Sequence, residues 1–219
     1  MCIRDSGLNA YNYDEQTFTA YQHNPENPHS LITNDVTDIS PSTQNDDGLW
    51  VSTYYRGIEY LNINNGQFTH YNKSTVPSLP SNQTWTVLDG GDNNLYIGHV
   101  GSGFSIFSLK DKSVKNFQNE MGNPASLPGN DVFCIIKDAN GNIWLGTNNG
   151  LALYNAANEN FITFRNNKND KYATLCSRIL SIRQLKDNRL WIASELNGIA
   201  ILNLKQGMFL SPEELSIEY

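Results

Sequence analysis

The sequence predicts an all-β protein, an incomplete β-propeller of about four and a half blades with four antiparallel strands each. The main observation is an internal repeat of 46 to 48 residues, in which three landmarks keep step with one another. The landmarks are a leucine in a polar linker, an aromatic residue and a glycine. The leucines are Leu31, Leu79, Leu127 and Leu175; the aromatic residues are Trp50, Tyr96, Trp144 and Trp191; the glycines are Gly57, Gly103, Gly150 and Gly198. Four short strands in a period of roughly 45 residues are typical of a propeller blade.

Each repeat contains four predicted strands in a fixed order. The first is a short apolar run, at 36–39, 84–88, 132–136 and 179–182, followed by a turn rich in Gly and Asn that favours a hairpin. The second strand carries the aromatic landmark, the third opens at the landmark glycine, and the fourth is rich in aromatic residues. Apolar residues spaced by 3 and 4 over ten or more positions do not occur, which excludes a helical solenoid.

Counting the strands predicts the domain organisation. Residues 7–34 form the C-terminal half of a blade plus a linker. The next blades are blade one (35–82), blade two (83–130), blade three (131–177) and most of blade four (178–210, ending near Phe209), before a new segment starts at 211–219. Residues 1–6, MCIRDS, match nothing later in the chain and lack the order of a signal peptide, so we expect a non-native leader there. Propellers usually close with more blades, which predicts that the chain is a fragment.

Composition limits the classes of partner. The 219 residues carry a net charge of −7 and only 17% charged residues. Nucleic acid and anionic membranes are not expected as partners, because phosphate neutralisation needs clustered Lys and Arg. No apolar run approaches 18 residues, so we expect no membrane contact in this segment. The three cysteines and four histidines lack metal-ligand spacing, so neither metal nor cofactor is predicted.

Blade three carries a family resemblance. Residues 140–151, NGNIWLGTNNGL, resemble the repeat of two-component regulator propellers, as do the linker 123–130 and the strand 67–71. The resemblance extends from Gly7 to about Leu210, with a departure in blade two, where LYIGH (95–99) replaces the expected Trp and Thr.

The resemblance implies a role. Such repeats build the periplasmic sensor region of hybrid two-component systems in glycan-degrading bacteria. It therefore implies a periplasmic location, an oligosaccharide ligand, and partners in the remaining blades and sensor domains of the same polypeptide; a homodimer is one arrangement it allows. Any kinase activity would lie in parts of the full-length protein that are absent here.

The repeated landmarks are expected to be structural. Trp50, Trp144 and Trp191 recur at one strand position, which favours packing between blades over sugar stacking, and Tyr96 takes the same position in blade two. The glycines at 57, 103, 150 and 198 are interpreted as backbone turns.

Positions that break the repeat are better ligand-binding candidates. The loop between second and third strands is Tyr54-Tyr55-Arg56 in blade one but only Asn148-Asn149 in blade three; His99 and Glu195 take corresponding places in blades two and four. Arg pairs with carboxylates through two donors and Tyr stacks, so the loop suits an acidic sugar or a partner carboxylate. The alternative is a solvated loop or inter-blade packing.

We therefore predict a ligand-sensing propeller without enzymatic activity, signalling by rearrangement of domains or of a dimer. One alternative is a carbohydrate-active propeller enzyme, a lyase or hydrolase. It would need an acid and a base converging at the propeller centre, where the first strands offer only Asp38 as a carboxylate. The other is a protein-interaction scaffold.

Overall fold

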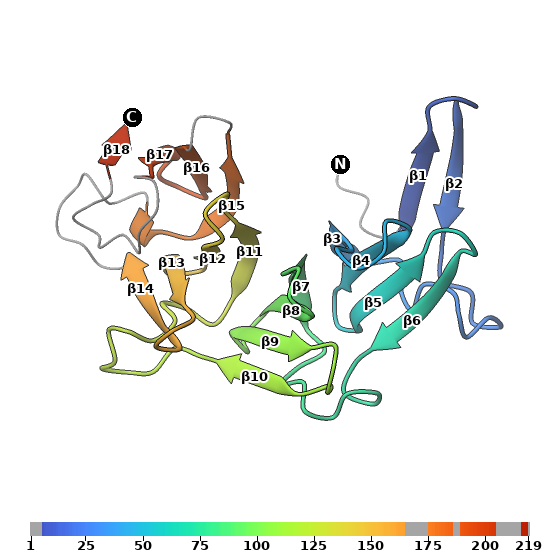
Figure 1. The fold of residues 1–219 in the computed structure, drawn as a ribbon, viewed down its shortest axis with the longest axis horizontal. Coiled ribbons are helices and arrows are strands. Elements are labelled where there is room, and N and C mark those ends of the chain that lie inside the picture. The colour runs from blue at the N-terminus through green and yellow to red at the C-terminus, as the bar shows by residue number, and fades with distance from the viewer. Residues whose placement is uncertain (1–5, 165–174, 186–188, 205–215, 219) are drawn as a thin grey trace. The chain divides into compact units, whose positions relative to one another are not determined.

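The computed structural model describes residues 6–164, 175–185, 189–204 and 216–218. These described residues form 18 strands (Figure 1). These are β1 (Leu8–Asn12), β2 (Thr17–Tyr21), β3 (Val36–Pro41), β4 (Gly48–Thr53), β5 (Gly57–Asn62), β6 (Gln67–Tyr71), β7 (Thr84–Asp89), β8 (Asn94–His99), β9 (Phe104–Ser108), β10 (Val114–Phe117), β11 (Val132–Lys137), β12 (Ile143–Thr147), β13 (Gly150–Asn155), β14 (Asn160–Phe164), β15 (Ile179–Gln184), β16 (Arg189–Ser194), β17 (Ile199–Asn203) and β18 (Ser216–Glu218).

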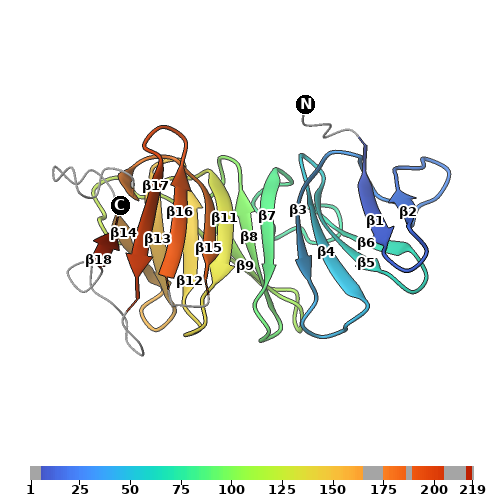
Figure 2. The ribbon, with the colours of Figure 1, turned by 90° about the horizontal axis from the view of Figure 1, so that it is seen from above.

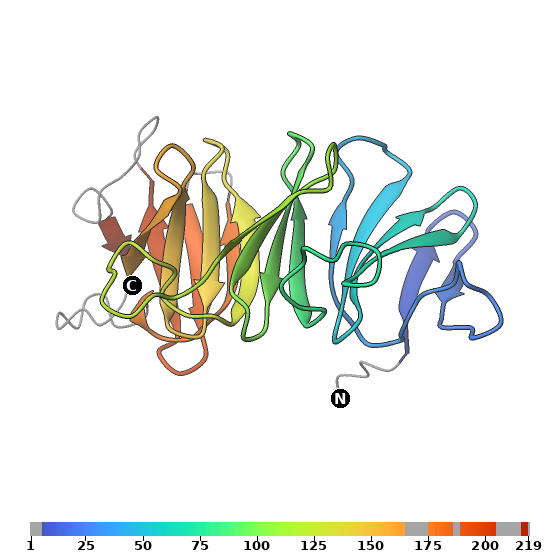
Figure 3. The ribbon, with the colours of Figure 1, turned by 90° about the horizontal axis from the view of Figure 1, so that it is seen from below.

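Sequential strands pair as antiparallel neighbours. They form one two-stranded sheet, β1-β2, and four four-stranded sheets, β3 to β6, β7 to β10, β11 to β14 and β15 to β18, in blades one to four (Figures 2 and 3). The expected four-stranded antiparallel sheets are thus confirmed. No helix in the described part of the chain has the length and hydropathy needed to cross a bilayer.

The chain clusters into two compact units. The first comprises Met1–Ile97 and Ile106–Val114, the second Gly98–Ser105 and Lys115–Tyr219. The expected leader at 1–6 lies outside the described residues except for Ser6. So do Phe209 and the segment 211–219, except for β18.

The landmark glycines close the hairpins between second and third strands. Gly57 pairs with Thr53 and has φ +94°, and Gly150 pairs with Thr147 and has φ +116°. A Cβ at Gly57 would collide with the carbonyl oxygen of Tyr71, and one at Gly150 with that of Phe164. Both the dihedral angle and the close approach of the fourth strand therefore require glycine.

In the first unit, Trp50 packs in a core with Ile58, Val87 and Leu95 and is only 3% exposed. Its indole N–H donates to the carboxylate of Asp89, 3.2 Å away. That carboxylate also accepts from the backbone N–H and hydroxyl of Thr43 and from the N–H of Gly91. Burial alone would raise the pKa of Asp89, but these donors hold it below its usual value.

In the second unit, Trp144 is fully buried in the core with Ile179 and Ile192, and its indole N–H donates to Asp138 at 2.9 Å. Trp191 departs from the expected packing, because 36% of it is exposed. Trp191 pairs with Ile201 as Trp144 pairs with Leu153, so both side chains take the same face of their blades. Trp144 is covered on that face by Ile179 and Ile192 of blade four, the next blade along the chain.

Candidate functional site

The loop predicted as a ligand contact lines a pocket in the first unit. The pocket has a volume of about 480 Å³ and is formed by the β4–β5 loop and the preceding linker; its lining residues are His23, Ile32, Thr33, Asn34, Asp35, Tyr54 and Arg56. The backbone N–H of Tyr54 donates to the carbonyl of Asp35 at 3.0 Å, which joins loop and linker. We call this site the loop pocket. The contribution of the linker was not predicted from the sequence.

Tyr55 has a strained backbone on the loop beside this pocket. Its φ is +68°, in the left-handed region that bulky residues rarely adopt. The corresponding residue of blade two is Gly101, with φ +77°. Blade one thus carries an aromatic side chain where blade two has the residue best suited to the conformation. Strain of this kind clusters at functional sites.

The two tyrosines of the loop form an aromatic pair, of which Tyr55 is exposed and Tyr54 half-buried. The ring centroids of Tyr54 and Tyr55 lie 3.8 Å apart, and the hydroxyl of Tyr55 donates to that of Tyr54 at 2.9 Å. Tyr54 also contacts Trp85 edge to face, with ring centroids 5.9 Å apart. Tyr55 remains 51% exposed and Arg56 is exposed. Tyr54, Tyr55 and Arg56 are therefore brought together, with the Tyr55 and Arg56 side chains exposed and the Tyr54 side chain half-buried.

Two further ionisable groups line the loop pocket. Nδ1 of His23 lies 2.8 Å from the carbonyl oxygen of Leu31, so this nitrogen carries the hydrogen. Oδ1 of Asp35 is buried without a hydrogen-bond partner among the described residues. The repeat explains the position of Asp35, because the corresponding Asp131 accepts from the N–H of Gly101 at 2.7 Å. We therefore read Asp35 as a loop anchor and assign no ligand contact to it.

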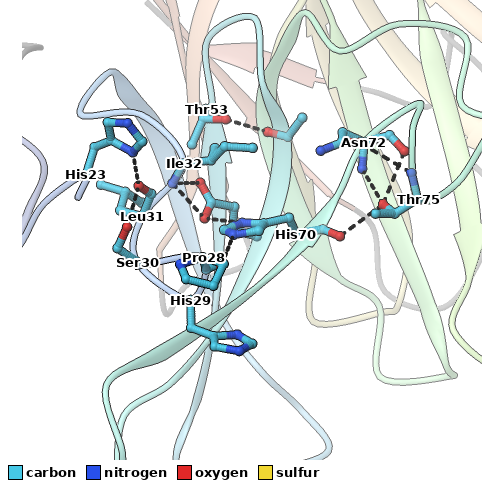
Figure 4. A network of polar contacts seen from close by, with 12 residues as sticks. His23, Pro28, His29, Ser30, Leu31, Ile32, Thr53, His70, Asn72 and Thr75 are labelled. Carbon is cyan, nitrogen blue, oxygen red and sulfur yellow. Dashed lines mark hydrogen bonds and ion pairs between the residues drawn. The ribbon is translucent and has the colours of Figure 1, made fainter. Parts of the chain in front are cut away.

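Behind the linker lies a buried acid–base pair that sequence reasoning missed (Figure 4). The carboxylate of Glu59 is fully buried; both oxygens lie 3.2 Å from the backbone nitrogen of Ile32, and Oε2 lies 2.9 Å from Nδ1 of His70. Nε2 of His70 lies 2.9 Å from the carbonyl oxygen of Pro28. Burial raises the pKa of Glu59 to about 8, and the Ile32 N–H only partly opposes this. The strand register of the β5–β6 hairpin, had it been worked out from the sequence, would have revealed the pair, since Glu59 and His70 are directly opposite each other.

The expectation that His99 faces the ligand surface is wrong. His99 is fully buried at the end of β8. Nε2 lies 2.9 Å from Oγ of Ser105, whose hydroxyl donates to Asn116, while Nδ1 has no partner among the described residues. Burial lowers the pKa of His99 to about 4, so it is neutral at pH 7. The His99 side chain is buried, as is the side chain of Thr53 at the corresponding position of blade one.

Glu195 is exposed, but it is engaged locally in the second unit. Its carboxylate forms an ion pair with Nη1 of Arg178 at 3.2 Å, and its N–H donates to the Arg178 carbonyl. The Arg178 guanidinium in turn lies 4.3 Å from the centre of the Phe133 ring. Glu195 is thus available at the surface only as part of this ion pair. Over the described residues, no group of three or more His, Cys, Asp or Glu side chains could hold a metal.

Comparisons with known proteins agree with the fold. The family model for the two component regulator propeller matches residues 126–149. Histidine kinase P4 of Formosa agariphila is 32% identical over 92 residues, which cover 41% of this chain and 7% of that protein.

Solved structures cover nearly the whole chain. The extracellular domain of BT3049 from B. thetaiotaomicron, described as a hybrid two component system, is 60% identical with a TM-score of 0.80; the match covers 93% of this chain and 25% of that one. The extracellular domain of BT4673 from the same organism is 19% identical with a TM-score of 0.70, over 92% of this chain and 26% of that one, a likeness that shows the fold alone. The chain thus spans about a quarter of the length of these solved chains. It carries a two-component regulator propeller repeat on a β-propeller fold that closely matches the extracellular domain of a hybrid two-component system.

Proposed function

We propose that this chain is part of a periplasmic sensor that binds an oligosaccharide at the loop pocket and signals by rearrangement of its domains or of a dimer. The single observation that carries the proposal is Tyr55. An exposed aromatic side chain is held at φ +68° beside a pocket, at the position where blade two has Gly101. A strained residue of this kind needs a compensating use, and ligand contact supplies one.

The residue types favour a sugar that carries a carboxylate. The faces of Tyr54 and Tyr55 are suited to the apolar face of a sugar ring, and the Arg56 guanidinium can donate two parallel hydrogen bonds to a carboxylate. A volume of about 480 Å³ lies within the range of small-molecule sites.

The sensor role is supported by the matched proteins. The relative with 60% identity is an extracellular domain described as part of a hybrid two component system, and the curated relative is a histidine kinase. This supports a periplasmic location, with kinase chemistry in other parts of the polypeptide. A ligand would then act through its differential affinity for two arrangements of the receptor, since equal affinity shifts no equilibrium.

Isothermal titration calorimetry on the intact extracellular portion tests the proposal. Neutral and uronate-containing oligosaccharides are titrated into the wild type and into Arg56→Ala. We expect binding of a uronate oligosaccharide that Arg56→Ala weakens. Lys110→Ala removes an exposed cation that does not line the pocket and should bind as the wild type does.

The same titration separates the alternatives. Continuous heat from turnover would favour the enzyme, and binding to no glycan in the panel would favour the protein-interaction scaffold. The contacts of Asp38 speak against a catalytic role, because its Oδ2 accepts from the hydroxyl of Thr86 and the N–H of Val87.

A further inference from the structure

The linkers before blades one and three dock on the fourth strand through the same two contacts. Phe68 donates its backbone N–H to His29 at 2.8 Å, and Phe161 donates to Ala125 at 2.8 Å. Two residues further on, a side chain reaches a proline carbonyl: His70 Nε2 lies 2.9 Å from Pro28 O, and Thr163 Oγ1 lies 3.1 Å from Pro124 O. The docking is therefore shared by these two blades, and of the two, blade one builds it with a titratable side chain.

The residue facing this side chain on the third strand also differs between blades. It is Glu59 in blade one and Ala152 in blade three, and each is fully buried. A carboxyl group at a position filled elsewhere by a methyl group is costly unless its hydrogen bonds are satisfied. In blade one, Ile32 N–H and His70 Nδ1 satisfy them.

The geometry determines where the protons lie. The Pro28 carbonyl can only accept, so Nε2 of His70 carries a hydrogen. A second proton must lie between Nδ1 and Oε2 of Glu59, since two lone pairs at 2.9 Å would repel. The high pKa of Glu59, about 8, places this proton on the carboxyl group. Both forms of the pair have no net charge.

No other charge competes for this proton. The titratable groups nearby are His23, His29 and Asp35 on the linker and Tyr71 on β6, and no described contact joins any of them to the Glu59 carboxyl group. Strand β4, on the other side of β5, contains no titratable residue. Among the described residues, His70 is therefore the one ionisable partner of Glu59.

We propose that Glu59 and His70 are positioning residues of the loop pocket, whose shared proton holds Ile32 and thereby the linker wall 32–35, so that the shape of the pocket depends on pH. The inference rests on the proposed function only in its use of the loop pocket. The backbone N–H of Ile32 donates a hydrogen bond to Glu59. At the other end of the wall, the carbonyl of Asp35 accepts a hydrogen bond from the N–H of Tyr54.

The linker is docked when it is hydrogen-bonded to Glu59 and His70, and released when these bonds are broken. The direction of the pH dependence follows from how many protons the two side chains bind in each state. Taken alone, the raised pKa of Glu59 favours docking most below the usual value of 4.5, with the advantage lost as the pH rises to about 8. The imidazole of the released pair can also hold this proton, which narrows the pH dependence to the upper part of that range. Docking should therefore weaken as the pH rises toward about 8, by at most about tenfold per pH unit for one proton.

Hydrogen exchange on the intact protein, without any ligand, tests this inference independently of the proposed function. Protection factors, corrected for intrinsic exchange, are measured for the amides of Ile32, Tyr54 and Phe68 from pH 5.5 to 9. We expect all three to fall by about tenfold between pH 6.5 and 8 and then to level off. Phe161, whose linker is held by a threonine, is the internal control and should remain constant.

Two variants separate the shared proton from simple packing. In Glu59→Gln the amide can donate to Nδ1 and its oxygen can accept from Ile32, so the linker should stay docked at neutral pH and the fall in protection between pH 6.5 and 8 should disappear. The double variant Glu59→Ala, His70→Thr copies blade three and should also give a flat profile, even if Glu59→Gln folds poorly. A flat wild-type profile, or a drop retained in both variants, would overturn the inference. A fall at Ile32 and Phe68 without one at Tyr54 would show that the pair does not reach the pocket.

Discussion

Replacing Tyr55 by glycine separates ligand binding from folding. The left-handed conformation costs a bulky residue roughly 1–2 kcal/mol, which glycine avoids. Against this, glycine gains about 0.5–1 kcal/mol of conformational freedom in the unfolded chain, and the contact with the Tyr54 ring, worth about 0.5–1.5 kcal/mol, is lost. These contributions nearly cancel, so the free energy of unfolding should stay within about 1 kcal/mol of the wild type.

Binding should change far more than stability. A ring that is 51% exposed and stacks on a ligand contributes at least about 1 kcal/mol, or about fivefold in Kd. Urea denaturation measures the first quantity and calorimetry with the bound oligosaccharide the second. Gly101→Tyr is the reciprocal control: no atom lies within 4 Å of its Cβ position, so backbone strain of about 1–2 kcal/mol, less about 0.5–1 kcal/mol for the freedom that glycine has in the unfolded chain, should appear there without a clash. A destabilisation above about 2 kcal/mol in Tyr55→Gly, or unchanged affinity, would refute the reasoning.

Three further outcomes are expected. Arg56→Ala should weaken binding by about 1–3 kcal/mol, the scale of a charged hydrogen bond, with an unchanged Tm by calorimetry; a collapse of Tm would make the loop structural. Trp144→Ala should destabilise by about 3–5 kcal/mol in urea, whereas Trp191→Ala, at a site that is 36% exposed, should cost clearly less; equal losses would contradict the burial argument. The lowered pKa of Asp89 means that its stabilisation is present above the usual value of 3.8 and is lost as the pH falls through the lower folded value, so unfolding midpoints should drop in acid for the wild type and less for Asp89→Asn.

Strand order and the loop of interest could be predicted from sequence because both depend on local information. Alternation of side chains and Gly-rich turns act within a few residues, and the predicted first strand 84–88 is observed at 84–89. The loop 54–56 stood out for the same reason, as a departure from a local repeat. Its strain could not be predicted, because a tyrosine gives no sign that its backbone is left-handed until the hairpin register is known.

Long-range pairings were decided by tertiary structure alone. The sequence determined that Glu59, His70, Trp191 and His99 stand at repeat positions, but not which face each side chain takes or what meets it. Asp89 receives hydrogen bonds from residues 39 and 46 positions away, and Glu59 bonds to a linker 27 positions earlier. Sequence periodicity specifies the strands because it reflects local backbone geometry. The proton shared in the Glu59–His70 pair depends on burial and distance, which exist only after the linker has packed against the sheet.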